Sequence, residues 1–228
     1  YPFYMEKEIM EQPRAINDTI LPRLKGGIPD FGDDRIPDSL FTDCDRICIV
    51  ACGTAMHAGL VFQALVKSVL HMHIDVELAS EFIYCDPVID SKTLVIAVSQ
   101  SGETIDTLEA VKYAMKNGAK TLGIINVKGS SIARECDYVL YTNAGPEIAV
   151  ASTKAYTTQL SLFFMIVCKM AQLKGIWDNA KVQEFTKEMC SVPEAMQKML
   201  DVRREIHVVA RTVLDAKDLF MIGRGLDY

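Results

Sequence analysis

The segment 99–104, which reads SQSGET, holds the residues of this chain that are best suited to chemistry. It directly follows the apolar run 94–98 and directly precedes a helical pattern. The first N–H groups of a helix have no intrahelical partners, and the helix dipole places about half a positive charge there. Three hydroxyls, on Ser99, Ser101 and Thr104, add donors beside them. The segment predicts either an anion site at a helix start or a plain N-cap.

A second loop of the chain has the same layout. The apolar run 46–51 is followed by the turn residues 52–55 (CGTA) and then by an apolar-periodic helical pattern. Both loops are predicted as strand-to-helix turns at the carboxyl ends of strands. In an open parallel sheet of strand order 2-1-3-4-5, ligands bind in the crevice between strands 1 and 3. The two loops follow those strands, so we expect them to converge on one ligand.

The alternation of apolar runs and helical patterns indicates the fold class. Strands are predicted at 46–51, 74–78, 94–98, 121–127 and 138–142. Strands that alternate with helices are typical of an α/β fold with a parallel sheet covered on both faces. We therefore predict a five-stranded parallel sheet in the flavodoxin-like order 2-1-3-4-5, flanked by helices. The tail from Ser152 onward is expected to be helical, with a break at Pro193.

The two ends of the chain differ from this central pattern. Residues 1–12 are predicted as an interdomain linker, and 13–213 as the first domain, with Pro13 at a helix start. Residues 214–228 contain an apolar run at 219–222 followed by a glycine turn, which repeats the shape of the segment 49–53. This repeat indicates either one more strand of the same sheet or, as the favoured interpretation, the opening strand of a truncated second copy of the domain.

Composition excludes several classes of partner. The 228 residues are 50% hydrophobic and 24% charged, with a net charge of −6, which argues against nucleic acid or an anionic membrane as a partner. The most apolar stretch, 160–168, is too short to span a bilayer and predicts a buried or interface helix. The seven cysteines show no CxxC or metal-ligand spacing, so we expect reduced thiols in a cytoplasmic protein and no metal site.

Three motifs together carry a resemblance to a known family: Cys52-Gly53-Thr54, SQSGET at 99–104, and the segment 143–155 (NAGPEIAVASTKA). In combination they resemble the SIS (sugar isomerase) family, and more closely the isomerase portion of the glutamine–fructose-6-phosphate aminotransferases (isomerizing). The segment 5–14 is similar to the link that leaves the glutaminase domain in that family, and 223–228 to the opening of its second SIS domain. The resemblance spans essentially the whole chain.

This resemblance implies a substrate and a set of contacts. The family makes glucosamine 6-phosphate from fructose 6-phosphate and glutamine. The residues implied to bind the phosphate of fructose 6-phosphate or glucosamine 6-phosphate are Ser99, Gln100, Ser101 and Thr104. Thr54 and the backbone of Val150 are implied to touch the sugar, with Ser152 of the binding site close by. A homodimer through SIS domains is implied, and no cofactor. The family's catalytic residues belong to the glutaminase and the second SIS domain, so none is assigned here, and the chain alone is expected to be catalytically incomplete.

The sequence leaves open the roles of Ala55 and Lys154 and two alternative functions. Ala55 stands where the family usually has a serine hydroxyl on the phosphate. Lys154 is either a ligand residue or a solvated helix lysine in a surface salt bridge. A free-standing SIS regulatory module and a fructosamine-phosphate deglycase are the alternative functions, and the stretch 147–154 is closer to the aminotransferases than to the deglycases. Neither loop has the GxGxxG spacing of a nucleotide-binding Rossmann protein.

Overall fold

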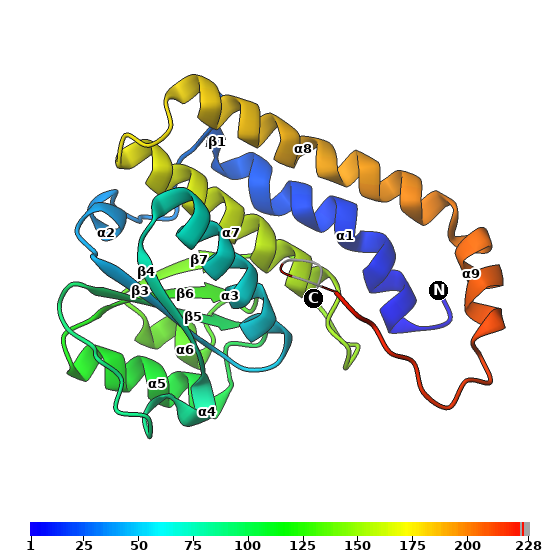
Figure 1. Cartoon of the computed structure of the whole chain (residues 1–228), viewed down its shortest axis with the longest axis horizontal. Coiled ribbons are helices and arrows are strands. Elements are labelled where there is room, and N and C mark those ends of the chain that lie inside the picture. Colours follow the sequence, from blue (N-terminus) through cyan, green and yellow to red (C-terminus); the bar gives the residue numbers. More distant parts are fainter. Residues whose placement is uncertain (224, 226–228) are drawn as a thin grey trace.

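The computed structural model of the chain describes residues 1–223 and residue 225 (Figure 1). Five strands form one parallel sheet in the order β4-β3-β5-β6-β7, which is the predicted order 2-1-3-4-5. The predicted α/β fold is therefore confirmed. The strand ends lie within two residues of the predicted ones: β3 (Arg46–Ala51), β4 (His73–Leu78), β5 (Thr93–Ser99), β6 (Lys120–Ile125) and β7 (Tyr138–Tyr141).

The central strands β3 and β5 are buried over almost their whole length because both faces of the sheet are covered there, whereas the edge strand β4 keeps the polar residues His73, Asp75 and Glu77. Ile47 and Ile49 of β3 belong to a core shared with α3 (Thr54–Leu65) and α7 (Lys154–Leu173). Cys48 and Val50 of the same strand belong to a second core shared with α5 (Ile105–Lys116). This alternation is the two-residue period of a strand, and burial on both sides replaces the usual polar positions with apolar ones.

The helices form two layers around the sheet (Figure 1). On one side α3 and α7 cover the sheet, and α1 lies outside them, between α7 and α8. On the other side lie α4, α5 and α6. The further elements are α1 (Tyr4–Ile20), η1 (Leu21–Arg23), β1 (Leu24–Lys25), β2 (Ile28–Pro29), α2 (Ser39–Thr42), η2 (Val66–Leu70), α4 (Ala79–Phe82), α6 (Ser131–Glu135), α8 (Asn179–Asp201) and α9 (Arg203–Thr212).

Two prolines that were expected to bound or break helices lie inside them. α1 begins at Tyr4, so the prediction that this helix starts at Pro13 is wrong. A proline has no N–H for the carbonyl four residues earlier, here that of Ile9. The side-chain amide of Gln12 donates to that carbonyl at 3.1 Å, which replaces the missing bond. The division into a linker at 1–12 and a domain from residue 13 remains a prediction.

The predicted break at Pro193 is also wrong, because α8 runs through it. The buried residues of α8 are Val182, Thr186, Met189 and Pro193, spaced by four, three and four positions. Such spacing places them on one face of the helix. Packing of that face keeps the helix continuous past the proline.

The chain after α9 is exposed and carries no strand within the described residues. The strand expected at 219–222 is not formed: these side chains are 65–95% exposed, and a strand needs a neighbour to bond to. The glycine turn is expected at 223–225. Residue 224 of that turn and residues 226–228 after it lie outside the described residues. That 214–228 opens a second SIS copy therefore remains a prediction. Within the described part of the chain, no helix has the length and apolarity needed to cross a bilayer.

Candidate functional site

The loop between β5 and α5 presents its hydroxyls at the start of a three-turn helix. Ser99 ends β5 and is 5% exposed, and its Oγ accepts a hydrogen bond from the N–H of Gly102 at 2.9 Å. Ser101 Oγ accepts from the N–H of Glu103 at 3.2 Å. The hydroxyls of Ser99 and Thr104 lie 3.3 Å apart. Because a backbone N–H donates to the Ser101 hydroxyl, its own proton is available to an acceptor in front of the loop; of the paired Ser99 and Thr104 hydroxyls, one donates to the other and the other proton is available.

The single carboxylate of the SQSGET motif is held away from this front. Glu103 Oε1 accepts from the N–H of Ser131, the first residue of α6, at 2.9 Å. The pKa of Glu103 is lowered, first by hydrogen bonding to the Ser131 side chain and backbone and then by the charge of Arg134. The anionic side chain is thus bound to α6, so it does not oppose an anion at the start of α5.

The loop between β3 and α3 contributes the second turn. Gly53 has φ +59° and ψ −137°, a conformation that only glycine adopts readily, and it precedes Thr54 at the start of α3. Ala55 is 7% exposed and follows in the first turn. Thr54 and Ala55, at the start of α3, line the same pocket as Ser101 and Thr104 of the β5–α5 loop.

A third segment, which we call the 143–153 loop, connects β7 to α7 and is organised by Glu147. One oxygen, Oε1, accepts from the N–H groups of Thr153 at 2.9 Å and Ala155 at 3.1 Å. The other, Oε2, accepts from the hydroxyl of Ser152 at 3.1 Å. Glu147 is thus a charged cap on the N-terminal end of α7, where a negative charge is favourable.

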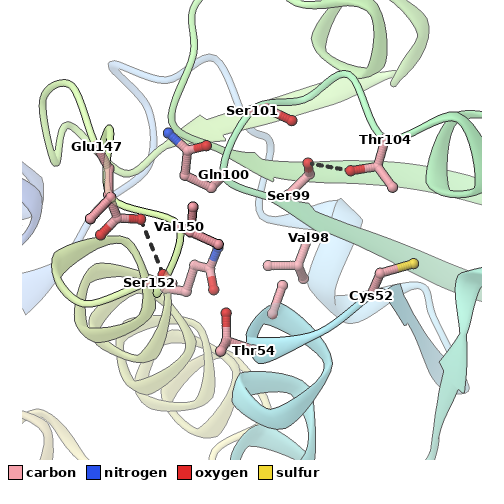
Figure 2. Close-up of a pocket in the computed structure, with 13 residues that line it drawn as sticks. Cys52, Thr54, Val98, Ser99, Gln100, Ser101, Thr104, Glu147, Val150 and Ser152 are labelled. Carbon is pink, nitrogen blue, oxygen red and sulfur yellow. Dashed lines mark hydrogen bonds between the residues drawn. The ribbon is translucent and has the colours of Figure 1, made fainter. Parts of the chain in front are cut away.

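These three segments enclose one pocket of about 210 Å³. All seven residues predicted to contact the substrate line it, and Figure 2 shows the hydroxyls of Ser99 and Thr104 across the pocket from Thr54 and Ser152. Ala55 also lines it, with a methyl group in place of a hydroxyl. Among the described residues of the lining, Glu147 alone carries a charge. An anion in this pocket would therefore be held by neutral hydroxyls, backbone N–H groups and two helix starts.

The model of the SIS domain family matches residues 40–169, which span the sheet, both helix starts and the 143–153 loop. The chain belongs to the SIS domain family. The motifs that carried the resemblance all lie within the matched segment.

Relatives of known name agree with this assignment. The chain is 46% identical, over its whole length, to a glutamine–fructose-6-phosphate aminotransferase (isomerizing) of Clostridium tetani, and 45% identical to one of Caldanaerobacter subterraneus. It spans 38% of the length of each. A solved structure, the C-terminal domain of a glucosamine-fructose-6-phosphate aminotransferase from Francisella tularensis, superposes with a TM-score of 0.94 at 37% identity. That match covers the whole of this chain and 64% of the Francisella chain.

Two residues of α1 hold the 143–153 loop in place. Glu8 of α1 is 2% exposed, and its carboxylate accepts from the N–H groups of Ile148 at 2.6 Å and Ala149 at 3.2 Å. Lys154 is also 2% exposed and pairs with Glu11 of α1 at 2.6 Å. Both contacts join residues that lie about 140 positions apart in the sequence. Lys154 is therefore not solvated and does not line the pocket of the three segments; its buried ammonium pairs with the partly exposed carboxylate of Glu11 and so positions the loop.

The Glu11–Lys154 pair predicts a pH-dependent contribution to stability. The hydrogen bond to Lys154 is the largest cause that lowers the pKa of Glu11 from its ordinary value of 4.5, and Lys7 adds to it. A carboxylate with a lowered folded-state pKa stabilises the fold above its ordinary pKa and loses that contribution as the pH falls through the lowered value. At pH 7 we expect Glu11→Gln to lower the free energy of unfolding by roughly 1–3 kcal/mol, since it leaves the buried ammonium unpaired.

Urea denaturation of both proteins from pH 7 to about pH 3.5 measures this contribution. The difference between wild type and Glu11→Gln should shrink as the pH falls below the ordinary pKa of a glutamate. Glu184→Gln is the matched control, because Glu184 pairs with Lys181 on the exposed surface at 2.8 Å and should contribute less than about 1 kcal/mol. A constant difference between wild type and Glu11→Gln at every pH would contradict the assigned role.

Five residues of the lining were given no role from the sequence: the apolar Val98 and Ala149, and the three polar or charged residues Cys52, Glu147 and Gln159. Cys52 belonged to a quoted motif but was given no role, and Glu147 was named only within its stretch. Gln159, on the second turn of α7, carried no signal beyond being polar next to an apolar run. A polar residue on the buried face of a helix that reaches a ligand-sized pocket is the feature that would have identified it.

Proposed function

We propose that this chain is the sugar-phosphate-binding SIS portion of a glutamine–fructose-6-phosphate aminotransferase (isomerizing). In this proposal the pocket holds fructose 6-phosphate or glucosamine 6-phosphate. The phosphate is bound by the side chains and backbone of Ser99, Gln100, Ser101 and Thr104, and the sugar lies against Thr54, Val150 and Ser152. The observation that carries the proposal is the cluster of three hydroxyls at the start of α5, on Ser99, Ser101 and Thr104, which line a pocket that has no lysine or arginine among its described lining residues.

The chemistry of the pocket suits a phosphate monoester at one end and a polyol at the other. Hydroxyls and helix-start N–H groups bind the oxygens of a phosphate dianion without burying a lysine or arginine. Glu147 lies in the 143–153 loop, on the other side of the pocket from the β5–α5 loop (Figure 2). A carboxylate in that place repels a phosphate and leaves that end to the sugar hydroxyls.

The activity of the whole enzyme is a proposal of the same kind. The complete reaction would pass the amide nitrogen of glutamine to the ketose carbon and isomerise the product to the 2-amino aldose. No residue of the pocket is assigned to those proton transfers. We propose that this chain binds and orients the sugar phosphate and that parts outside it supply the catalytic groups.

Location and assembly complete the proposal. We propose a cytoplasmic protein, supported by seven free cysteines of which Cys44, Cys48, Cys136 and Cys168 are buried as thiols. Burial raises the pKa of Cys48, Cys136 and Cys168 to about 12, so these thiols stay protonated and unreactive. We also propose a homodimer through SIS domains, supported by the resemblance of the chain to its family; sedimentation of the full protein checks this.

The phosphate assignment predicts the effect of removing two hydroxyls. Isothermal titration of the Ser101→Ala, Thr104→Ala double variant with glucosamine 6-phosphate should show binding weakened by about 1–3 kcal/mol, because two neutral donors are lost. A double variant of two exposed hydroxyls outside the pocket, Ser68→Ala with Thr212→Ala, is the control and should bind as wild type. Unchanged affinity in the Ser101, Thr104 variant would overturn the phosphate assignment.

A further inference from the structure

Gln159 lies in the wall of the pocket on α7, the helix that follows the 143–153 loop. It is 2% exposed, and its neighbours in the sequence are apolar or bonded within the helix. Thr158 donates to the carbonyls of Lys154 and Ala155, and Ser161 donates to that of Thr157. These hydroxyls complete their own hydrogen bonding inside α7.

The side-chain amide of Gln159, in contrast, does not complete its hydrogen bonding within the described part of the chain. Its Oε1 is fully buried and has no hydrogen-bond partner among residues 1–223 and 225. A buried polar atom without a partner costs free energy, and nearly all such atoms in folded proteins are paired with protein, water or ligand. A leucine or methionine would fill the same wall of α7 without that cost. The amide is thus unexplained by the packing of this chain alone.

The position of Gln159 indicates which part of a ligand it would meet. α7 approaches the pocket from the side of Ser152 and Thr54, whereas the hydroxyls of Ser99, Ser101 and Thr104 lie on the other side (Figure 2). The terminal torsion of glutamine is broad and roughly two-fold, so either the oxygen or the NH₂ group can face the pocket. An amide that donates and accepts matches a hydroxyl, which also donates and accepts; a phosphate dianion only accepts.

We infer that Gln159 is a specificity-determining residue, whose side-chain amide hydrogen-bonds a hydroxyl of the bound sugar. The inference rests on the proposed function, because it takes the ligand to be a sugar phosphate with its phosphate on the β5–α5 loop. Gln159 then distinguishes a polyhydroxyl phosphate from phosphate itself. The orphaned oxygen is paired in the complex and unpaired without ligand.

Gln159→Met tests this, because methionine keeps the length and the unbranched shape of glutamine and removes both polar atoms. Isothermal titration measures the Kd of each protein for glucosamine 6-phosphate and for inorganic phosphate. We expect the variant to bind the sugar phosphate about 5–20-fold more weakly and inorganic phosphate within about twofold of wild type. Its melting temperature without ligand should equal or exceed that of wild type, since a buried unpaired group is gone.

Gln172→Met is the matched control, since Gln172 lies on the same helix but donates to Asn179 at 2.8 Å, outside the pocket. It should leave both dissociation constants unchanged. Should Gln159→Met fold poorly, Gln159→Leu takes its place in the same titrations. Equal weakening of both ligands, or no change in either, would overturn the role assigned to Gln159.

The two proposals fail in different ways. If the Ser101, Thr104 double variant weakens sugar-phosphate binding and Gln159→Met does not, only the role of Gln159 is wrong. If wild type binds neither ligand, or the double variant binds as wild type, the proposed function is wrong and the inference about Gln159 is overturned with it.

Discussion

Replacing Gly102 by alanine is expected to lower the free energy of unfolding by about 2–4 kcal/mol and to abolish measurable sugar-phosphate binding. Gly102 has φ +67°, a conformation that costs other residues energy. A Cβ atom there would lie 2.6 Å from the Cβ of Ser130 and 2.9 Å from Cγ2 of Ile125. Ser130 is 2% exposed and cannot move aside without displacing the loop before α6. The β5–α5 loop would shift and take its hydroxyls with it.

Gly129→Ala separates the two causes of this loss, the cost of a positive φ and the clash of a Cβ atom with Ser130 and Ile125. Gly129 has φ +71°, but a Cβ atom there meets nothing within 4 Å. We therefore expect only the backbone term, about 1 kcal/mol, and unchanged binding. Urea denaturation and isothermal titration of both variants measure the comparison. Equal losses in the two variants would show that the close approach of Gly102 to Ser130 does not hold the loop in place.

Replacing Glu147 by alanine is expected to lower the free energy of unfolding by about 2–3 kcal/mol and to weaken sugar-phosphate binding about tenfold or more. The variant loses charge-assisted hydrogen bonds from Thr153, Ala155 and Ser152 at the N-terminal end of α7. Val150 and Ser152, which both line the pocket, then lose one of the groups that hold their loop, beside Glu8 and the Glu11–Lys154 pair. Denaturation and titration of the variant measure the two effects.

Glu147→Gln distinguishes the contribution of Glu147 as a helix cap from the effect of its negative charge on the bound phosphate. Glutamine retains one acceptor oxygen for the helix end but removes the negative charge from the pocket. We expect a smaller loss of stability than in Glu147→Ala and sugar-phosphate affinity at or above that of wild type, because the repulsion of the phosphate is reduced. If Glu147→Ala remains as stable as wild type and binds as tightly, Glu147 does not organise the 143–153 loop.

The sheet and the starts of α3 and α5 could be predicted from the local pattern of apolar, polar and glycine residues. The run at 46–51 and the run at 94–98 are continuous apolar strands, and each ends in small polar residues ahead of a helical pattern. A strand period, a glycine and a helix start are encoded by neighbouring residues, so sequence reasoning can detect them. The convergence of the two loops then followed from the topology of a parallel sheet.

What the sequence could not reveal depends on contacts between distant segments. Glu8 bonds to the 143–153 loop, and Glu11 pairs with Lys154, yet nothing near either glutamate in the sequence indicates a partner. The helix through Pro13 is another such case, because its continuity depends on one side chain, that of Gln12. Gln159 became notable only once the pocket and the missing partner of its oxygen were known together.

The central claim is that the phosphate of a hexose phosphate binds at the start of α5, and backbone amide NMR tests it most directly. During titration with glucosamine 6-phosphate, the ¹H–¹⁵N signals of Ser101, Gly102 and Thr104 should show the largest shifts, with saturation at one affinity. A mixed-charge groove between α1 and residues 143–146, lined among others by Lys7 and Arg14, is the reference region and should show little change. Large shifts in that groove with unmoved signals in the β5–α5 loop would contradict the account.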